Sequence, residues 1–467
     1  KAHLYDGSTV VFPGGINVHD GKIRGQGEKF DVALENNKFI DEIALEEIAA
    51  MESFQTPVNV AATTAASTVG TAGWLALGGL AALALFGSCP TVYSADAGDP
   101  ILEAELFSYS IAPSFQARDI DRLGLKSVQD GHFVLDFRNE MLETHYIDQL
   151  EILEVSHTED QVAYPDSTGH PIVVGATVAP VRAVDQDGRN ILPDVTSADG
   201  RVWSATSNRL ANVGPNDFHD SLEFEFSLPK DSGEVALVLH MRNSMLNTVL
   251  LYDVMLKEQS FAALDWMGHD LGHFGNRAEL GLWYREHMGM TVSIWRDGKF
   301  RKVGRIGDQG PIAWSERAFV LDAPRGDNLK IRLSFVADNW RIDQVGLAID
   351  TQRGEVRTIP VSTAKSLQEH RPDIPEYLAQ PDKTYLITRP GESVQLGFDV
   401  GESKQSRTFF LVSEGYYMEW MRSEWLTEEH RGKFEPTSDA LMQSLSLYAQ
   451  KRDTYRQQFE SIKVPVR

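Results

Sequence analysis

Cysteine is almost absent from this sequence of 467 residues, since Cys89 is the only one. A single cysteine excludes a disulfide within the chain and any zinc or iron–sulfur site built from several thiolates. Clustered basic residues are absent too, and 44 Lys and Arg face 67 Asp and Glu, for a net charge of −23. Binding to phosphates depends on grouped Lys and Arg, so the composition excludes a general nucleic-acid-binding protein.

The common catalytic motifs are also missing. The chain contains no G-x-S-x-G, no P-loop and no Rossmann glycine pattern. Cys89 lies between Ser88 and Pro90 and is interpreted as a structural thiol rather than a nucleophile. The sequence therefore predicts no catalytic residue and no cofactor.

One long stretch of the sequence is uncharged, with no charged residue between Glu52 and Asp96. Within it, residues 69–86 read VGTAGWLALGGLAALALF, close to the shortest helix that crosses a bilayer. Its small residues favour packing against another membrane helix. We predict a membrane-inserted segment at residues 56–88, with Trp74 and Leu75 in the anchor. The alternative is a buried hydrophobic hairpin.

Residues 1–55 alternate short β-prone runs with turn dipeptides such as Asp6-Gly7 and Asp20-Gly21. Such dipeptides between apolar runs are typical of hairpins. This pattern predicts a small β-barrel of about five strands.

A weak internal repeat follows, with copies at residues 135–150, 239–254 and 333–345. Each copy has an apolar strand, a polar bend and a second strand entered through Asp. The bends contain Asn139, Asn243 and Asn339. The spacing of about 100 residues fits one β-sandwich per copy. We predict that these residues hold the bends through their own backbone, with sugar or calcium binding as the alternative.

The repeat predicts two to three β-sandwich-like units, the first at residues 89–230 and the rest at residues 231–415. Residues 416–467 are predicted to be a helical tail. Apolar residues at helical spacing indicate one helix over residues 435–462 and a second over residues 416–429, which contains Trp420 and Trp425. The predicted fold class is therefore mainly β with a C-terminal helix.

The sequence HDLGH contains the candidate metal ligands His269, Asp270 and His273. Two histidines four residues apart on a helix can share one metal ion. Gly268 and Gly272 weaken a helix here, and the flanking sequence has a β pattern. A loop or short helix with hydrogen-bonded histidines is therefore the preferred interpretation, and a metal site is the alternative.

The order of these features resembles a group of uncharacterised bacterial envelope proteins, many with a lipoprotein signal. The similarity lies in the segments IALEEIAAMES, GSCPTVYS, LEAELFSYSIAP and RNEMLETHYIDQLEILEVSH. This resemblance implies membrane anchoring in the cell envelope with most of the chain outside the cytoplasm, and a lipidated cysteine before Lys1. It implies no activity.

Together these features predict a non-catalytic accessory or scaffolding subunit of an envelope complex, in contact with other membrane or envelope proteins and the lipid bilayer. One alternative is a carbohydrate- or ligand-binding surface protein that uses the bends. An open groove with exposed Trp favours it, and buried bends count against it. Another alternative is a metal-dependent hydrolase centred on His269 and His273.

Overall fold

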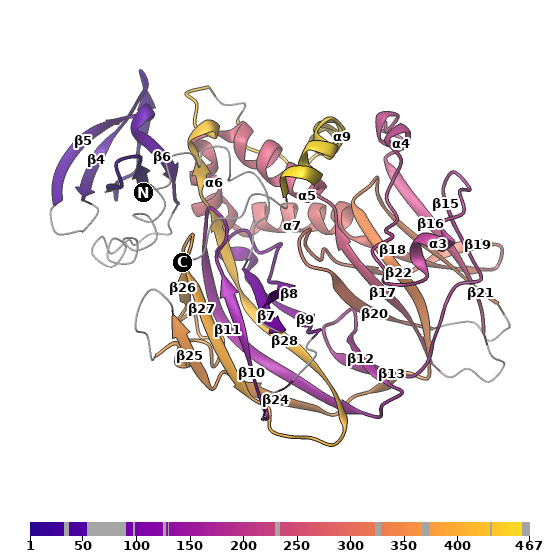
Figure 1. Ribbon diagram of the computed structural model, residues 1–467. Coiled ribbons are helices and arrows are strands. Elements are labelled where there is room, and N and C mark those ends of the chain that lie inside the picture. Colours follow the sequence, from indigo (N-terminus) through magenta and orange to yellow (C-terminus); the bar gives the residue numbers. More distant parts are fainter. Residues whose placement is uncertain are drawn as a thin grey trace.

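A computed structural model describes residues 1–31, 37–53, 90–96, 99–124, 128, 130–228, 234–322, 328–366, 373–429 and 432–459. In these residues the protein is mainly β, with six sheets and a C-terminal helix (Figure 1). The predicted membrane segment at residues 56–88, including Trp74 and Leu75, lies outside the described residues, as does Cys89. Within the described ranges, no helix is long and apolar enough to span a membrane.

The N-terminal strands form one sheet in the order β29-β6-β1-β2-β4-β3, with β5 paired to β4. The described strands form one open seven-stranded sheet, where a closed barrel of about five strands was predicted. β29 comes from the far end of the chain and pairs with β6, so the module is tied to the rest of the protein. The strands are β1 (Ala2–Leu4), β2 (Thr9–Val11), β3 (Asn17–His19), β4 (Lys22–Phe30), β5 (Asn37–Ala44), β6 (Ile48–Met51) and β29 (Met421–Arg422).

An outer unit consists of two sheets packed face to face. The first has the order β25-β27-β10-β7-β8, and the second the order β24-β11-β28-β9 with β26 on β11. Side chains from both sheets share one core, including Phe137 and Leu396 from the first and Ile152 and Leu411 from the second. The strands are β7 (Thr91–Asp96), β8 (Asp99–Glu105), β9 (Ala117–Arg122), β10 (His132–Arg138), β11 (Glu143–His157), β24 (Val356–Pro360), β25 (Thr363–Ser366), β26 (Leu386–Thr388), β27 (Ser393–Asp399) and β28 (Ser406–Glu419).

An inner unit has the same plan, with sheets β14-β22-β17-β20 and β15-β16-β21-β18-β19 around a second core. Its strands all fall between residues 177 and 349, whereas the outer unit uses strands on both sides of that range. The inner unit is therefore an insertion in the outer one. The strands are β14 (Thr177–Val178), β15 (Arg182–Asp185), β16 (His219–Ser227), β17 (Val235–Asn243), β18 (Met290–Arg296), β19 (Lys299–Ile306), β20 (Ser315–Leu321), β21 (Asn328–Val336) and β22 (Trp340–Ile349).

This insertion does not follow the predicted boundary between residues 230 and 231. β10 pairs with β27 and β16 pairs with β21, so strands from both sides of that boundary lie in the same sheets. A linear repeat carries no information on such nesting, because pairing between distant strands is set by the tertiary fold.

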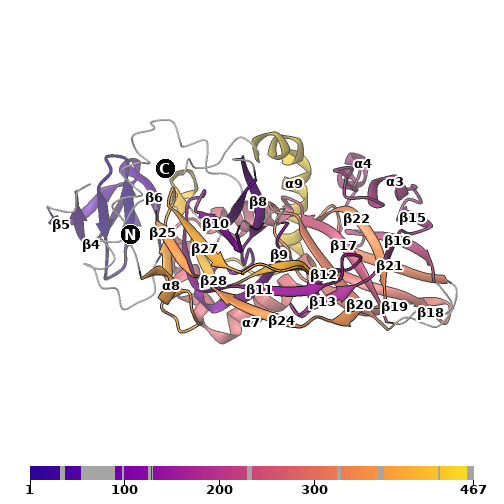
Figure 2. The ribbon, with the colours of Figure 1, turned by 60° about the horizontal axis from the view of Figure 1, so that its bottom comes forward.

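A small sheet of β12 (Val162–Pro165), β13 (Pro171–Val174) and β23 (Gln352–Arg353) lies between the two units (Figures 1 and 2). Alternate residues of a strand face opposite sides of the sheet. Val173 accordingly packs in a cluster with outer-unit side chains such as Phe410. Its neighbours Ile172 and Val174 pack in a cluster with the inner-unit residue Ala236. The small sheet therefore joins the two cores.

Helices fill residues 246–288, where strands were predicted. They include α5 (Leu246–Val249), a π-helix (Leu250–Leu256), α6 (Ala262–Gly268) and α7 (Phe274–Met288). The prediction of a second strand in the second repeat copy is therefore wrong. The apolar run of that copy fits a buried strand and a buried helix equally well, because periodicity alone does not separate the two.

The predicted C-terminal helix is confirmed as α9 (Ser438–Phe459), whose residues Leu441, Leu445 and Tyr448 are buried. The predicted helix over residues 416–429 is wrong. Residues 416–419 end β28, and Trp425 lies in a 3-10 turn. The aromatic residues here favour a strand because Tyr416 stacks on its cross-strand partner Tyr146, with ring centroids 4.6 Å apart.

The three asparagine bends are buried, with Asn139, Asn243 and Asn339 at most 1% exposed. Asn139 holds its own bend, because its Oδ1 accepts a hydrogen bond from the Met141 amide at 3.2 Å. The others also tie distant segments together. Asn243 Oδ1 accepts from the Gln309 amide at 2.7 Å, and Asn339 Nδ2 donates to the Met288 carbonyl at 2.9 Å.

Asp338, beside the third bend, fixes α9 to the inner unit. It is fully buried and has a left-handed φ of 57°. Its carboxylate accepts hydrogen bonds from Arg341 at 2.8 and 2.9 Å and from Tyr448 on α9 at 3.0 Å. Arg452 on α9 lies 3.2 Å away. One buried carboxylate therefore neutralises two arginines from different elements.

We predict that Asp338→Asn lowers the free energy of unfolding by about 3 kcal/mol, because it leaves two buried guanidinium groups without a counter-charge. Asn keeps the side-chain shape and tolerates the left-handed backbone, so the change tests the charge. Urea unfolding measures the effect. Asp453→Asn, an exposed change on the same helix, serves as the control, and equal losses in the two variants would contradict the prediction.

Candidate functional site

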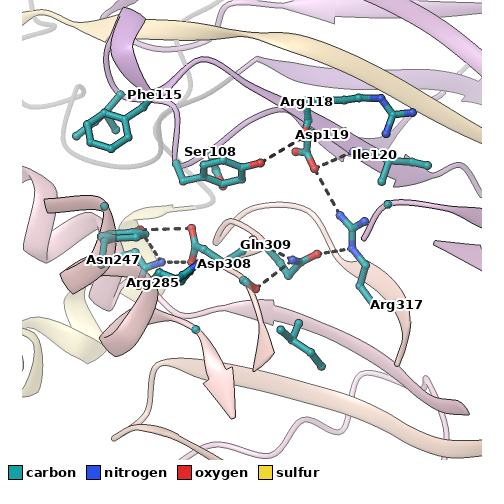
Figure 3. Close-up of a pocket in the computed structure, with 18 of the residues that line it drawn as sticks. Ser108, Phe115, Arg118, Asp119, Ile120, Asn247, Arg285, Asp308, Gln309 and Arg317 are labelled. Atoms are coloured by element: carbon teal, nitrogen blue, oxygen red, sulfur yellow. Dashed lines mark hydrogen bonds and ion pairs between the residues drawn. The ribbon is translucent and has the colours of Figure 1, made fainter. Parts of the chain in front are cut away.

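A cavity of about 530 Å³ lies where the outer unit, the inner unit and the helices meet (Figure 3). Its apolar walls come from the outer unit and from the helices, and its polar groups come from all three parts, with Asp308 and Gln309 on the loop between β19 and β20. The apolar lining includes Ile111, Phe115, Ile120, Leu251, Met255 and Leu280. Cavities of this size, mostly apolar with a few polar groups, are typical of small-molecule sites.

The loop at residues 307–314 is held from both units. The Asn243 amide donates to the Gly310 carbonyl at 2.8 Å. From the outer unit, the Glu105 carboxylate accepts from the amides of Ile312 and Ala313 at 2.6 and 3.1 Å. Gly310 has φ +81°, and a Cβ there would lie 2.7 Å from the Glu105 carboxylate. Glycine is therefore required here for both conformation and space.

Asp308 on this loop faces the cavity. Its carboxylate accepts hydrogen bonds from Asn247 Nδ2 and, at 3.3 Å, from the Tyr284 hydroxyl. The carboxyl keeps some contact with the cavity space but is otherwise surrounded by protein. This burial, against the opposing hydrogen bonds, raises the pKa of Asp308 to about 7.

Asn247 leaves a buried acceptor at the same place. Its side chain is 7% exposed, and its Oδ1 has no hydrogen-bond partner among the described residues. When Asp308 is ionised it orients this amide, because only the Nδ2 end of an asparagine can donate to a carboxylate. The inner end of the cavity therefore presents the Asp308 carboxylate as an acceptor, whereas Asn247 Oδ1 is closed to solvent.

Charged side chains from the edges of both units form the next wall. Arg317 on β20 lies 3.5 Å from Asp119 and 3.7 Å from Asp121, both on β9. Burial and the neighbouring Asp119 raise the pKa of Asp121, against the effect of Arg317. Arg317 also donates to Gln309 Oε1 at 2.6 Å, so its charge is already balanced within the protein.

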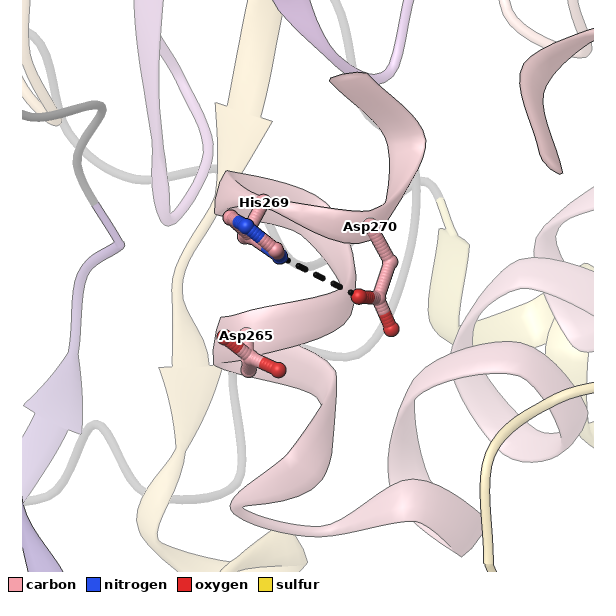
Figure 4. A group of neighbouring side chains, drawn as sticks. All are labelled: Asp265, His269 and Asp270. Atoms are coloured by element: carbon pink, nitrogen blue, oxygen red, sulfur yellow. Dashed lines mark hydrogen bonds and ion pairs between the residues drawn. The ribbon is translucent and has the colours of Figure 1, made fainter. Parts of the chain in front are cut away.

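The predicted metal ligands lie elsewhere, between α6 and α7. Asp265, His269 and Asp270 bring their ligand atoms within 4.8 Å of one another (Figure 4). The Lys433 ammonium pairs with Asp270 and lies 3.7 Å from Asp265. Both carboxylates therefore already face the positive charge that a metal ion would otherwise supply. His273 is outside this group, and its ring centroid lies 4.8 Å from that of His269.

Asp265 and Lys433 lie beside the histidines without belonging to a sequence motif, and no sequence pattern predicts the cavity. The cavity residues Asn247, Asp308 and Arg317 carry no motif and come from separate segments. One signal was present, because Asn243 of the repeat binds the loop that carries Asp308.

Comparison with known proteins identifies no matching family model and no matching curated protein. Among solved structures, a mutant VP2 protein of infectious bursal disease virus, in derived T=1 particles, matches with 11% identity and a TM-score of 0.13, over 75% of this chain and 88% of that chain. The structure of Sulfolobus turreted icosahedral virus matches with 9% identity and a TM-score of 0.12, over 72% of this chain and 91% of that chain. Such TM-scores indicate neither a shared fold nor a shared function.

The raised pKa of Asp308 predicts how stability changes with pH. The unfolded carboxyl titrates near pH 4, so between about pH 4 and pH 7 the folded state binds a proton that the unfolded state does not. This contribution to stability is lost as the pH rises through that window, by up to about 4 kcal/mol.

Asp308→Asn removes this titration. We expect the variant and the wild type to be similar at pH 4, and the variant to be more stable at pH 8. Urea unfolding across this range measures the difference, with the exposed change Asp453→Asn as the control. Parallel stability curves for wild type and Asp308→Asn would contradict the assignment.

Gly310→Ala tests the clamp on the loop. A Cβ there meets the Glu105 carboxylate and also has to adopt a left-handed φ, so we expect a loss of roughly 2–3 kcal/mol. Gly188→Ala is the matched control, because Gly188 has φ +74° with open space around it. It is expected to lose about 1 kcal/mol in thermal unfolding, and an equal loss at both sites would show that Glu105 does not confine the loop.

Proposed function

We propose that this chain is a non-catalytic accessory or scaffolding subunit of a protein complex in a bacterial cell envelope, attached to the membrane through residues 56–88. The proposal rests on one observation, the burial of the repeated asparagine residues within the protein. All three asparagine bends are buried and bind backbone groups of the protein itself. The repeat therefore builds a framework and leaves no set of exposed polar groups at these bends.

The same observation weighs against sugar binding at the bends, because buried asparagines cannot reach an external ligand. The hydrolase alternative is weakened by Lys433, whose ammonium lies beside Asp265 and Asp270. A catalytic metal needs these carboxylates itself and an open coordination position.

The nested arrangement also supports a scaffolding role. Two sandwich-like units share the small β12-β13-β23 sheet, and the N-terminal module is bound through β29. A Glu52 carboxylate in this module accepts from Thr144 at 2.9 Å and pairs with Lys1 at 3.0 Å. Such connections suit a subunit that holds partners at fixed positions.

Extraction in mild detergent followed by native mass measurement tests this function. We expect a stoichiometric complex with other envelope proteins. Replacing residues 56–88 with a Gly/Ser linker of equal length is expected to release the chain from the membrane, whereas His273→Ala is expected to leave both the complex and the anchoring intact. A chain that runs alone would contradict the accessory-subunit role, and continued membrane association of the linker variant would contradict the anchor.

A further inference from the structure

We infer that the cavity between the two units binds a small apolar molecule that carries a protonated amine, with the ammonium group at Asp308. This site is separate from the proposed scaffolding role and does not depend on it.

The Asp308 carboxylate at the inner end of the cavity is an acceptor, so it suits a ligand that donates. Asn247 Oδ1 is closed to solvent, and the Asp308 carboxylate, which lines the cavity, lies against the other end of the same amide. The donors that Asp308 has in Asn247 Nδ2 and the Tyr284 hydroxyl carry no charge, so a cationic donor adds an attraction that these two groups do not supply. An ammonium supplies three donors and the charge that a carboxylate pairs with.

The walls suit a cation with an apolar body. Leu251, Met255 and Leu280 come from the helices, and Phe115 and Tyr284 contribute aromatic rings. Aromatic faces attract cations, and aliphatic side chains favour transfer of an apolar group from water.

The arginines of the lining do not provide an anion site at the inner end. Arg317 is engaged by Asp119, Asp121 and Gln309. Arg118 and Arg285 are exposed, so water screens their charges. A carboxylate ligand placed at Asn247 would instead face the like charge of Asp308, which disfavours it.

Isothermal titration calorimetry of the full chain with three probes of similar shape tests this inference. The probes are 2-phenylethylamine, the neutral 2-phenylethanol and the anionic 3-phenylpropanoate, at pH 8 where Asp308 is ionised. We expect the amine to bind at least tenfold tighter than the alcohol, and the anion to bind most weakly. Equal affinities, preference for the anion, or no binding of the amine at millimolar concentration would overturn the inference.

Two variants separate the charge from the cavity. Asp308→Asn is expected to remove the preference for the amine while the alcohol still binds. Gly281→Leu places a side chain in the cavity beside Phe115, since a Cβ at position 281 lies 3.4 Å from that ring. It is expected to abolish binding of both probes while α7 remains folded, because leucine favours a helix over glycine. Undiminished amine binding in either variant would place the ligand elsewhere.

Affinity for the amine is also expected to fall several-fold from pH 8 to pH 6, as Asp308 takes up a proton. The other ionisable groups around it are Tyr109 and Asp119 of the outer unit, Tyr284 on α7 and Arg317 on β20, with Asp166 and the exposed Arg118 and Arg285 also in the lining. A pH dependence that persists in Asp308→Asn would assign it to one of these groups and would contradict the role of Asp308.

Discussion

Two sheet edges meet through charged side chains, and the arrangement of the units depends on this contact. β9 is the last strand in one outer-unit sheet, and β20 is the last strand in one inner-unit sheet. Arg122 of β9 pairs with Glu316 of β20, and Arg317 of β20 faces Asp119 and Asp121 of β9. Unpaired edges promote aggregation, so placing these edges together and covering them with charge protects both. The charges also resist close apolar packing, because each must keep its partner.

The cavity follows from this contact. Charged side chains fill the contact between the two edges on one side of the cavity. On the other side, the Glu105 carboxylate fixes the loop of residues 307–314. The space between them is closed by helices rather than by a third sheet. Carboxylates collect in this place, and the pKa values of Asp121 and Asp308 are raised by their burial. Surface acidity alone does not produce such shifts, since water screens exposed charges.

The sequence predicted local features better than long-range ones. The mainly β class, the C-terminal helix and the strand–bend–strand form of the first and third repeat copies follow from patterns within about 20 residues. The first strand of the second copy is present as β17, but its second strand was not predictable, because the apolar run there fits a helix as well as a strand. The residues of the cavity were not predictable, because Asn247, Asp308 and Arg317 meet only after one unit has been inserted in the other. The HDLGH motif was visible in the sequence, but nothing in it predicted that Lys433 lies beside Asp270.

The two units form one framework joined at β9 and β20. Pulsed electron spin resonance between labels on the two units tests it most directly. Val134 of the outer unit and Val181 of the inner unit are 53% and 60% exposed and suit labelling, in a background where Cys89 is replaced by Ser. We expect one narrow distribution of the distance between the two labels, and a broader distribution in Arg317→Ala. A broad or double distribution in the otherwise unaltered chain would contradict it.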